Sequence, residues 1–309
     1  MGKQLDGKLV VLVGGSGFVG RHLAQDLLAR GARLRIAARH PEKAFAVKPL
    51  ANLGQMQAVR CDVTRPDSLR AAIAGADAVV YLAGTFGAGQ KQVQGDGPRI
   101  AAEAAAAAGA EAFVLVSSLS ADAGSEGGYA SSKAAGEEGA RQAFPQATIM
   151  RPSVIFGQDD QFVTMFAGLV SSMPALPVFG PQAKLQPVFV DDVAAAITAA
   201  LEYPALHGGK TYELAGPQVL TMLELHEMIA QAQGRERMFV PVPDALSALF
   251  AALPGTPMSS DQWTMLKAGN VATGTLPGLA KLGVEARPLS LFLDKWMVRF
   301  RKHGRFSVA

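Results

Sequence analysis

The sequence contains a single cysteine, Cys61, among its 309 residues. One cysteine cannot form an internal disulfide, so we expect a fold without disulfide bonds that suits a reducing compartment. The five histidines and this cysteine show none of the spacings that are typical of a metal site. No bound metal is therefore expected.

Long apolar runs are also missing. No stretch approaches the roughly 18 apolar residues of a membrane-spanning helix, and the first residues lack the apolar core and cleavage site of a signal peptide. Charged residues make up only 18% of the chain, and the net charge of +3 is too small to indicate nucleic-acid binding. We expect a cytoplasmic protein that binds no nucleic acid and contacts a membrane only peripherally.

Positive charge is concentrated in the segment that begins at Lys295. Cations alternate there with large apolar side chains, in the order Lys295, Trp296, Met297, Val298, Arg299, Phe300, Arg301, Lys302, His303, Arg305 and Phe306. Such a basic amphipathic segment can lie on the inner, anionic face of a membrane or dock on an acidic partner. It can equally be a solvated, partly frayed end of the chain. Both interpretations stay open.

Hydrophobic residues make up 49% of the chain, enough for a large buried core. In the first half, short apolar runs predict strands at Leu9–Val13, Leu34–Ala38, Met56–Cys61, Ala78–Ala83, Phe113–Ser117 and Thr148–Arg151. Helices are predicted between them at Val19–Arg30, Pro66–Ala74, Pro98–Ala108 and Tyr129–Phe144. This alternation predicts an α/β fold of the Rossmann type, a doubly wound parallel sheet with helices on both faces.

The alternation stops after Arg151, where proline becomes frequent. Helical patterns return at Val193–Leu201, Met222–Gln233 and Ala245–Leu253. We interpret residues 1–152 as a dinucleotide-binding domain, and residues 153–309 as a smaller, irregular α/β region for substrate or partner that is interleaved with the sheet.

A glycine pattern follows the first predicted strand and opens the first predicted helix. Its glycines allow a sharp turn, a close approach of pyrophosphate to backbone N–H groups, and tight packing of helix on strand. The helix N-terminus adds unpaired N–H donors and a favourable dipole. The expected cofactor contacts in this loop are Gly14, Ser16, Gly17, Phe18, Val19 and Gly20.

The second predicted strand bears on which dinucleotide is bound. NAD sites usually place an acid about twenty residues after the loop, where it binds the ribose 2′-OH. Here the chain reads Ala37-Ala38-Arg39-His40, with Lys43 just beyond and no acid. The planar fork of Arg39 suits a 2′-phosphate. The sequence favours NADP(H), with NAD(H) as the alternative if Arg39 is an ordinary surface residue.

Two further strand ends complete the expected nucleotide site. Asp62 and Val63 follow the third strand, where Asp62 can reach the adenine edge. Leu82, Ala83 and Gly84 follow the fourth, where small residues let the backbone pass close to the cofactor.

Tyr129 and Lys133 lie four residues apart and therefore on one face of the fourth helix. A nearby cation is expected to lower the pKa of the phenol, so that Tyr129 can exchange a proton near neutral pH. The pair follows Ser117 and Ser118, which end the fifth strand. This arrangement in a dinucleotide-binding chain predicts a catalytic site.

With Gly-x-x-Gly-x-x-Gly and Tyr-x-x-x-Lys together, the chain resembles an atypical, extended short-chain dehydrogenase/reductase. It is most similar to the family of nucleotide-binding accessory subunits of respiratory complex I and their bacterial relatives. The stretches that carry this closer match are Arg151–Gly157, Asp160–Phe162, Gln186–Val193 and Thr211–Pro217.

The resemblance implies that Tyr129 and Lys133 are the catalytic pair and that Pro152 and Val154 line the nicotinamide end. It also implies a hydroxyl ahead of the tyrosine, for which Ser118 is the first candidate and Ser117 and Ser120 are alternatives. Gln94 stands near the place of the asparagine that completes the proton relay in active members.

Two functions follow. One is an NADP(H)-dependent oxidoreductase acting on a carbonyl or hydroxyl of a hydrophobic, quinone- or lipid-like substrate, held near Phe86, Phe156 and Phe162. The other is a non-catalytic NADP(H)-binding accessory or assembly protein whose partners are subunits of a membrane-bound respiratory complex. In the resembling complex I subunits the nucleotide is regarded as structural.

Overall fold

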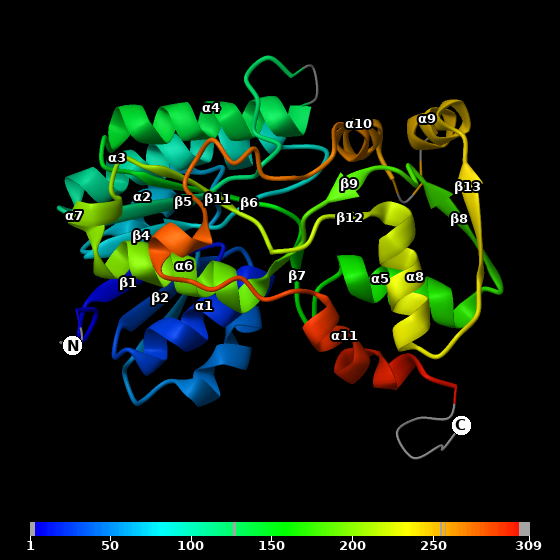
Figure 1. Cartoon of the computed structure of the whole chain (residues 1–309). Coiled ribbons are helices and arrows are strands. Elements are labelled where there is room, and N and C mark those ends of the chain that lie inside the picture. The colour runs from blue at the N-terminus through cyan, green and yellow to red at the C-terminus, as the bar shows by residue number, and fades with distance from the viewer. Residues whose placement is uncertain (1–3, 126–127, 254, 257, 303–309) are drawn as a thin grey trace. The chain divides into compact units, whose positions relative to one another are not determined.

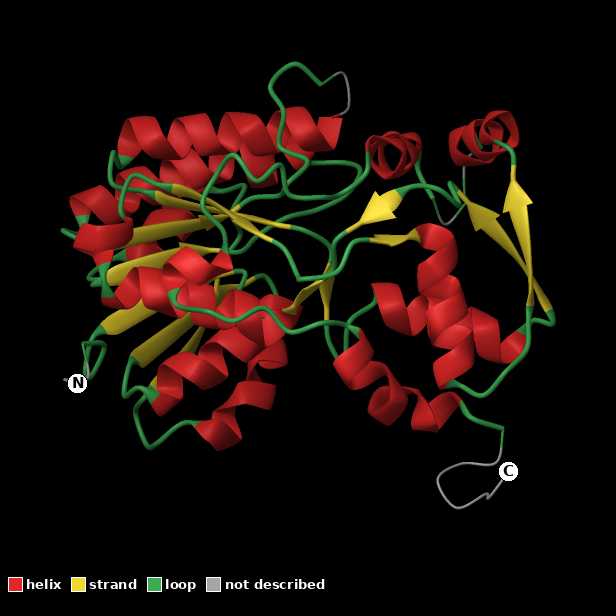
Figure 2. Cartoon of the chain, in the orientation of Figure 1, coloured by secondary structure: helices red, strands yellow, loops and turns green. Residues whose placement is uncertain are grey.

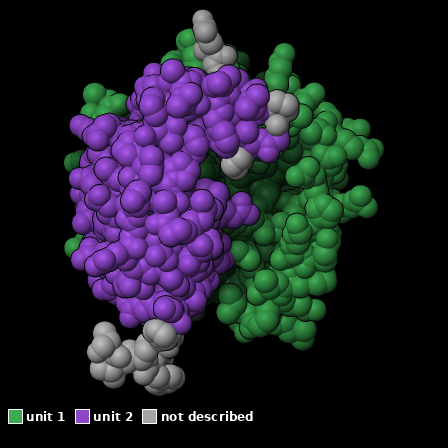
Figure 3. Space-filling view, turned by 90° about the vertical axis from the view of Figure 1, so that its right-hand side faces the viewer, with its two compact units in different colours: residues 1–152, 190–214, 273–285 green, residues 153–189, 215–272, 286–309 purple. Residues whose placement is uncertain are grey.

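The computed structural model describes residues 4–125, 128–253, 255–256 and 258–302. The chain divides into two compact units, which Figure 3 distinguishes by colour. The first comprises residues 1–152, 190–214 and 273–285, and the second comprises residues 153–189, 215–272 and 286–309. Two segments assigned from sequence to the C-terminal region, 190–214 and 273–285, thus belong to the first unit.

The first unit is built on a seven-stranded parallel sheet in the order β11-β6-β5-β4-β1-β2-β3. The strands are β1 (Leu9–Val13), β2 (Arg33–Ala38), β3 (Met56–Arg60), β4 (Ala78–Tyr81), β5 (Ala112–Val116), β6 (Thr148–Pro152) and β11 (Thr211–Leu214). The predicted Rossmann-like α/β fold is confirmed, and each predicted strand is present with its ends shifted by at most two residues. The strand β11, which pairs with β6, was not predicted.

Helices cover both faces of this sheet (Figures 1 and 2). One face carries α1 (Phe18–Ala29), the 3-10 helix η1 (Pro41–Leu50) and α6 (Val190–Glu202). The other carries α2 (Pro66–Ile73), the π-helix η2 (Lys91–Asp96), α3 (Gly97–Ala107) and α4 (Gly128–Ala143). Two short helices, α7 (Pro204–His207) and η3 (Leu279–Leu282), complete the unit.

The order of connection reverses between β1 and β4, which lie side by side at the centre of the sheet. The chain leaves β1 toward β2 and β3, then returns to β4 and continues toward β5 and β6. Ligands of open parallel sheets bind at the carboxyl ends of the strands at this reversal point. The glycine loop after β1 and the Leu82–Gly84 segment after β4 both lie there.

The second unit combines helices with three two-stranded sheets. Its helices are α5 (Phe162–Ser172), α8 (Met222–Ala232), α9 (Asp244–Ala252), α10 (Ser260–Ala268), α11 (Ser290–Trp296) and the 3-10 helix η4 (Met297–Phe300). The strand pairs are β7 (Ile155–Phe156) with β10 (Val188–Phe189), β8 (Ala175–Phe179) with β13 (Met238–Val242), and β9 (Lys184–Leu185) with β12 (Leu220–Thr221). Capping boxes begin α8 at Thr221 and α10 at Ser259.

The segment from Lys295 packs on its own unit as far as the structure describes it. Met297 is buried, and the Trp296 ring stacks on Phe292 with 4.8 Å between centroids. The Arg301 guanidinium donates to the Ala232 carbonyl at 3.1 Å. His303, Arg305 and Phe306 lie outside the described residues, so the membrane interpretation of this segment stays a prediction. Within the described ranges no helix has the length and apolar character to cross a membrane.

Candidate nucleotide and catalytic site

The glycine loop has the shape of a cradle that side chains would fill. Gly14 has φ +82°, and a Cβ there would lie 2.9 Å from the Ala83 nitrogen. A Cβ on Gly20 would lie 2.3 Å from the Gly15 carbonyl oxygen, closer than atoms can approach. The loop therefore requires glycine at both positions, because the turn after β1 passes against the segment after β4 and α1 packs directly on the turn.

The first turn of α1 has no side-chain cap within the described part of the chain. Gly17 is the N-cap residue, and no side chain accepts a hydrogen bond there among the residues described. Ser16 and Phe18 are half-buried beside it, and Phe18 meets His22 edge to face. A helix start without a side-chain cap leaves backbone N–H groups for a bound anion. The cradle and this helix start fit the pyrophosphate of a dinucleotide.

Arg39 lies just past β2 and is exposed. Asp62, after β3, accepts hydrogen bonds from the Thr64 hydroxyl (2.8 Å) and backbone N–H (3.0 Å). These bonds, and to a smaller extent the charges of Arg39 and Arg65, lower the pKa of Asp62. Arg39 is thus close enough to influence Asp62.

The neighbouring predicted residues have more ordinary surroundings. His40 is exposed, and its Nδ1 lies 3.2 Å from a Glu42 carboxylate oxygen. Val63 and Ala83 pack against the core beneath the sheet edge. Leu82 donates its backbone N–H to the Val13 carbonyl at 2.8 Å, which ties the end of β4 to the end of β1.

Gln94 joins three elements near this edge. Its buried side chain accepts a hydrogen bond from the Thr85 N–H (3.2 Å) and donates one to the Ser132 hydroxyl (3.0 Å). It belongs to the π-helix η2, a rare form that occurs frequently at functional sites. A Cβ on Gly84 would lie 3.4 Å from Gln94 Oε1 and 3.5 Å from Lys133 Nζ. The backbone at Gly84 thus lies close to both Gln94 and Lys133, although a side chain there would make only ordinary van der Waals contacts.

The structure brings Ser118, Tyr129 and Lys133 together. The Ser118 side chain is close enough to the Tyr129 phenol to lower its pKa. The Tyr129 ring stacks on Phe86 at 4.5 Å between centroids, and Lys133 Nζ lies 5.8 Å from the same ring centre. Lys133 is buried and donates to the Val116 carbonyl at 3.2 Å. A hydroxyl, a phenol and an amine thus converge where β5 meets α4.

The expected direction of the pKa shift of Tyr129 is wrong. Burial raises the pKa of the phenol above its ordinary value, and the hydrogen bond with Ser118 offsets only part of that rise. Burial also lowers the pKa of Lys133 to about 8, opposed by the charge of Glu137. The pair is therefore a protonated phenol beside a readily deprotonated amine, because desolvation outweighs the attraction that the spacing alone suggests.

Glu137 lies under this site, and sequence reasoning missed it. Its carboxylate is fully buried and accepts hydrogen bonds from Arg151 Nε (2.8 Å), a terminal Arg151 nitrogen (2.7 Å) and the Ser117 hydroxyl (2.6 Å). The hydroxyl of Ser117, proposed as an alternative catalytic group, therefore donates its hydrogen bond to Glu137. The signal available in the sequence was the i, i+4 spacing of Lys133 and Glu137 in α4.

The remaining predicted residues lie at or beyond the end of β6. Pro152 is buried and accepts a hydrogen bond from the Leu119 N–H at 3.0 Å. Val154 belongs to the second unit, where its N–H donates to Asn270 Oδ1 at 2.8 Å. Phe156 does not line a substrate pocket as expected, because it is fully buried among Phe189 and other aromatic rings of its own unit. Within the described ranges, no group of His, Cys, Asp and Glu side chains could hold a metal ion.

The fold and the site define an α/β protein that binds a nicotinamide dinucleotide. Residues 14–204 match the family model described as NAD(P)H-binding, so the chain belongs to that family. More particularly, it belongs with NADH dehydrogenase (ubiquinone) 1 alpha subcomplex subunit 9: it is 32% identical to the mitochondrial protein of that name from Mus musculus over 318 residues. That alignment covers 98% of this chain and 83% of the mouse protein. The resemblance seen in the sequence is confirmed.

Another relative carries the name of an enzyme. The chain is 34% identical to a ceramide reductase from Caulobacter vibrioides over 260 residues, which cover 81% of this chain and 80% of that protein. For the Arabidopsis thaliana subunit 9, at 33% identity, the aligned part spans only 64% of that protein's length. Relatives with the same core thus include both respiratory subunits and a reductase.

Solved structures agree on the fold. The dTDP-glucose 4,6-dehydratase DesIV from Streptomyces venezuelae, determined with NAD bound, superposes with a TM-score of 0.73 at 18% identity, covering 94% of this chain and 96% of that one. At that identity the likeness shows the architecture and not the substrate.

Proposed function

We propose that this protein is an NADP(H)-dependent oxidoreductase that reduces a carbonyl group on a hydrophobic, lipid-like substrate. The observation that carries the proposal is the position of the buried Lys133 beside the Tyr129 ring, with the buried Ser118 close enough to lower the pKa of the phenol. A protein that only stores a nucleotide has no need to place a phenol, a second hydroxyl and an amine at one point of the strand edge.

Each side chain has a distinct task in this proposal. A nicotinamide dinucleotide held in the glycine loop would supply the hydride for the carbonyl carbon. Tyr129 donates its proton to the carbonyl oxygen, and the raised pKa keeps the phenol protonated until that moment. Ser118 donates a hydrogen bond to the same oxygen. The Lys133 ammonium stabilises the phenolate that the proton transfer leaves behind.

Two observations favour a lipid-like substrate. Phe86 stacks on Tyr129 and is still 53% exposed, so an apolar surface adjoins the catalytic phenol. Apolar walls with a few polar groups are typical of sites for hydrophobic ligands. The Caulobacter relative named ceramide reductase supports the same class of substrate.

The choice of NADP(H) over NAD(H) rests on Arg39. We expect Arg39→Ala to raise the Kd for NADPH about 10- to 100-fold, because a charge-assisted hydrogen bond to phosphate contributes about 1.5–3 kcal/mol. The Kd for NADH should change less than about threefold, since NADH has no 2′-phosphate. Nucleotide titrations followed by fluorescence measure both values.

The matched control for this titration is Arg33→Ala, which removes an exposed arginine from the start of the same strand. It should leave both affinities unchanged. Equal losses for NADPH and NADH in Arg39→Ala would contradict the assignment of the 2′-phosphate to this residue.

A non-catalytic accessory role is the second candidate. The alignment with the mouse complex I subunit runs over 98% of this chain, so the resemblance is not confined to the nucleotide-binding half. In that role NADP(H) would stabilise the folded protein by binding only the native state, and the partners would be subunits of a respiratory complex.

Turnover separates the two candidates. The purified protein is incubated with NADPH and, in turn, a long-chain aliphatic ketone, decylubiquinone, and a ceramide whose secondary hydroxyl is oxidised to a ketone. We expect NADPH oxidation with stoichiometric formation of the alcohol from at least one carbonyl lipid. Tight NADPH binding without oxidation of NADPH by any of the three would favour the accessory role.

A further inference from the structure

The helix α9 in the second unit exposes its apolar side chains. From Ala245 to Leu253 it has no charged residue, and its only polar side chain, Ser247, is buried and donates to the Pro243 carbonyl at 3.1 Å. Leu246, Leu249 and Leu253 are 57%, 60% and 52% exposed. An ordinary surface helix shows the opposite arrangement, with leucine inside and charge outside.

The paired strands β8 and β13 of the same unit also expose apolar side chains. β8 and β13 pair in parallel, with Ala175 opposite Met238 and Pro177 opposite Val240. These four residues are exposed, whereas Leu176 and Val178, which alternate with them in β8, are buried. Side chains two apart in a strand share a face.

Helix α9 packs on the continuation of that face. The next residue on it is Phe179, whose ring stacks on Phe250 of α9 at 4.9 Å between centroids. Figure 1 shows β8 and β13 side by side, with α9 beyond the end of β13. We name the exposed part the outer face; its members are Ala175, Pro177, Met238, Val240, Leu246, Leu249 and Leu253.

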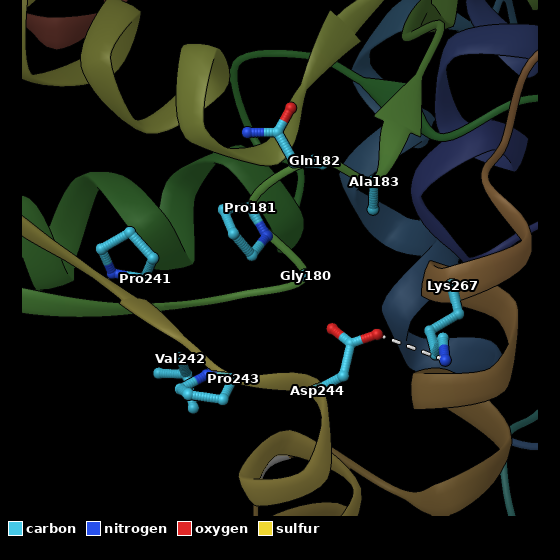
Figure 4. Close-up of a pocket in the computed structure, with 9 residues that line it drawn as sticks. All are labelled: Gly180, Pro181, Gln182, Ala183, Pro241, Val242, Pro243, Asp244 and Lys267. Atoms are coloured by element: carbon cyan, nitrogen blue, oxygen red, sulfur yellow. Dashed lines mark ion pairs between the residues drawn. The ribbon is translucent and has the colours of Figure 1, made fainter.

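The residues of the outer face carry no charge, but charged residues border it, and the exposed Glu236 lies two positions before Met238. The only charged residue from Met238 to Leu253 is Asp244, and its carboxylate forms an ion pair with Lys267 at 3.3 Å (Figure 4). The pair borders a cavity of about 440 Å³ whose other walls include Pro181, Pro241, Val242 and Pro243. The β13 segment thus contributes both to the outer face and to a cavity of mixed polar and apolar lining.

We propose that the outer face lies on a lipid bilayer, with its leucine and methionine side chains among the acyl chains below the headgroups. Five large side chains exposed by 47–66% leave on the order of 500 Å² of apolar surface, which is less than the roughly 800 Å² that each partner of a stable dimer buries. This inference holds whether or not the protein turns over a substrate.

Vesicle binding tests the proposal and distinguishes it from binding through the basic segment after Lys295. The full chain is sedimented with vesicles of phosphatidylcholine alone and with vesicles in which about one third of the lipid is phosphatidylglycerol. We expect binding to both, with affinities that differ by less than about threefold and change little with salt. Binding that requires phosphatidylglycerol and disappears at high salt would overturn the proposal in favour of the basic segment.

A double substitution places the contact on α9. Leu246→Gln/Leu249→Gln should weaken binding to phosphatidylcholine vesicles about tenfold or more, because two partly exposed leucines lose their transfer into the acyl region. Glutamine is a good helix former, so α9 should be retained. The control Leu53→Gln/Leu206→Gln changes two exposed leucines of the first unit and should bind as the unchanged protein does.

A label gives a readout that does not depend on affinity. Cys61 is buried, so Leu249→Cys can be labelled selectively with a polarity-sensitive dye. Its emission should shift to the blue when phosphatidylcholine vesicles are added, and the label on Leu53→Cys should not respond. Unchanged emission from both labels would overturn the proposal. So would light scattering that shows a dimer of the unchanged chain that Leu246→Gln/Leu249→Gln abolishes, since a second copy would then cover the face.

Discussion

Tyr129→Phe is expected to lower kcat for carbonyl reduction by about 10²- to 10⁴-fold, the usual contribution of a general acid. Phenylalanine keeps the ring that stacks on Phe86 and removes only the hydroxyl, whose pKa Ser118 influences. The Kd for NADPH should therefore stay within about threefold of its original value. Steady-state kinetics with the reducible lipid and a nucleotide titration measure the two effects.

The matched control for this substitution is Tyr203→Phe. Tyr203 is 40% exposed and lies at the start of α7, away from the strand edge that holds the catalytic groups. Its loss of a hydroxyl should leave kcat unchanged. Equal activity of Tyr129→Phe and the unchanged protein would remove Tyr129 from the mechanism, whereas a loss of NADPH binding would give it a structural role.

The pH dependence of the same reaction distinguishes Tyr129 from Lys133. Lys133 has a pKa of about 8, so the ammonium that stabilises the phenolate is lost as the pH rises through that value. The pKa of Tyr129 is raised, so the phenol keeps its proton over this range. We therefore expect kcat to fall above about pH 8. A rate that stays constant to pH 9 would show that the charge of Lys133 is not needed.

The glycine loop could be predicted because its requirements are local. Gly14 needs a positive φ. Gly20, only six residues further along the chain, needs space because its position lies against Gly15. The adjacent strand and helix are also recognisable from their own residues, since β1 was predicted with its exact ends. A turn, strand or helix start that is determined by residues close together in the chain can therefore be predicted from a single sequence.

Long-range pairing explains the missed strand. β11 has only four residues, Thr211–Leu214, and its partner β6 ends about sixty residues earlier in the chain. The residue pattern of such a short segment does not distinguish an edge strand from an irregular loop. The Arg141 side chain, which donates to the Thr211 hydroxyl at 2.7 Å, helps to hold this edge, and that contact too spans distant parts of the sequence.

Burial explains the errors at the site. The spacing of Tyr129 and Lys133 indicates that an amine lies near a phenol, but it does not show how far both are removed from water. Phe156 was expected in a pocket for the same reason, since its partners Phe189 and Phe292 follow it by about 30 and 140 residues. Both errors concern which groups are desolvated, a property of the packed protein.

Glu137→Ala is expected to lower the free energy of unfolding by about 3–5 kcal/mol, because it removes the carboxylate of a buried ion pair and leaves the guanidinium without its partner. The substitution leaves the Arg151 guanidinium, whose side chain is only 25% exposed, and the buried Ser117 hydroxyl without their acceptor. It also removes the contact that joins α4 to the ends of β5 and β6. Urea denaturation followed by circular dichroism measures the loss.

The neighbouring residue provides the control, since Glu138 is exposed and accepts a hydrogen bond only from Gln142, one turn along the same helix. Glu138→Ala should change the free energy of unfolding by less than about 0.5 kcal/mol. Similar losses in both variants would show that the Glu137–Arg151 pair contributes no more than a surface contact. Glu137→Gln adds a test at the site: because the carboxylate raises the pKa of Lys133, its loss should move the decline of kcat to lower pH.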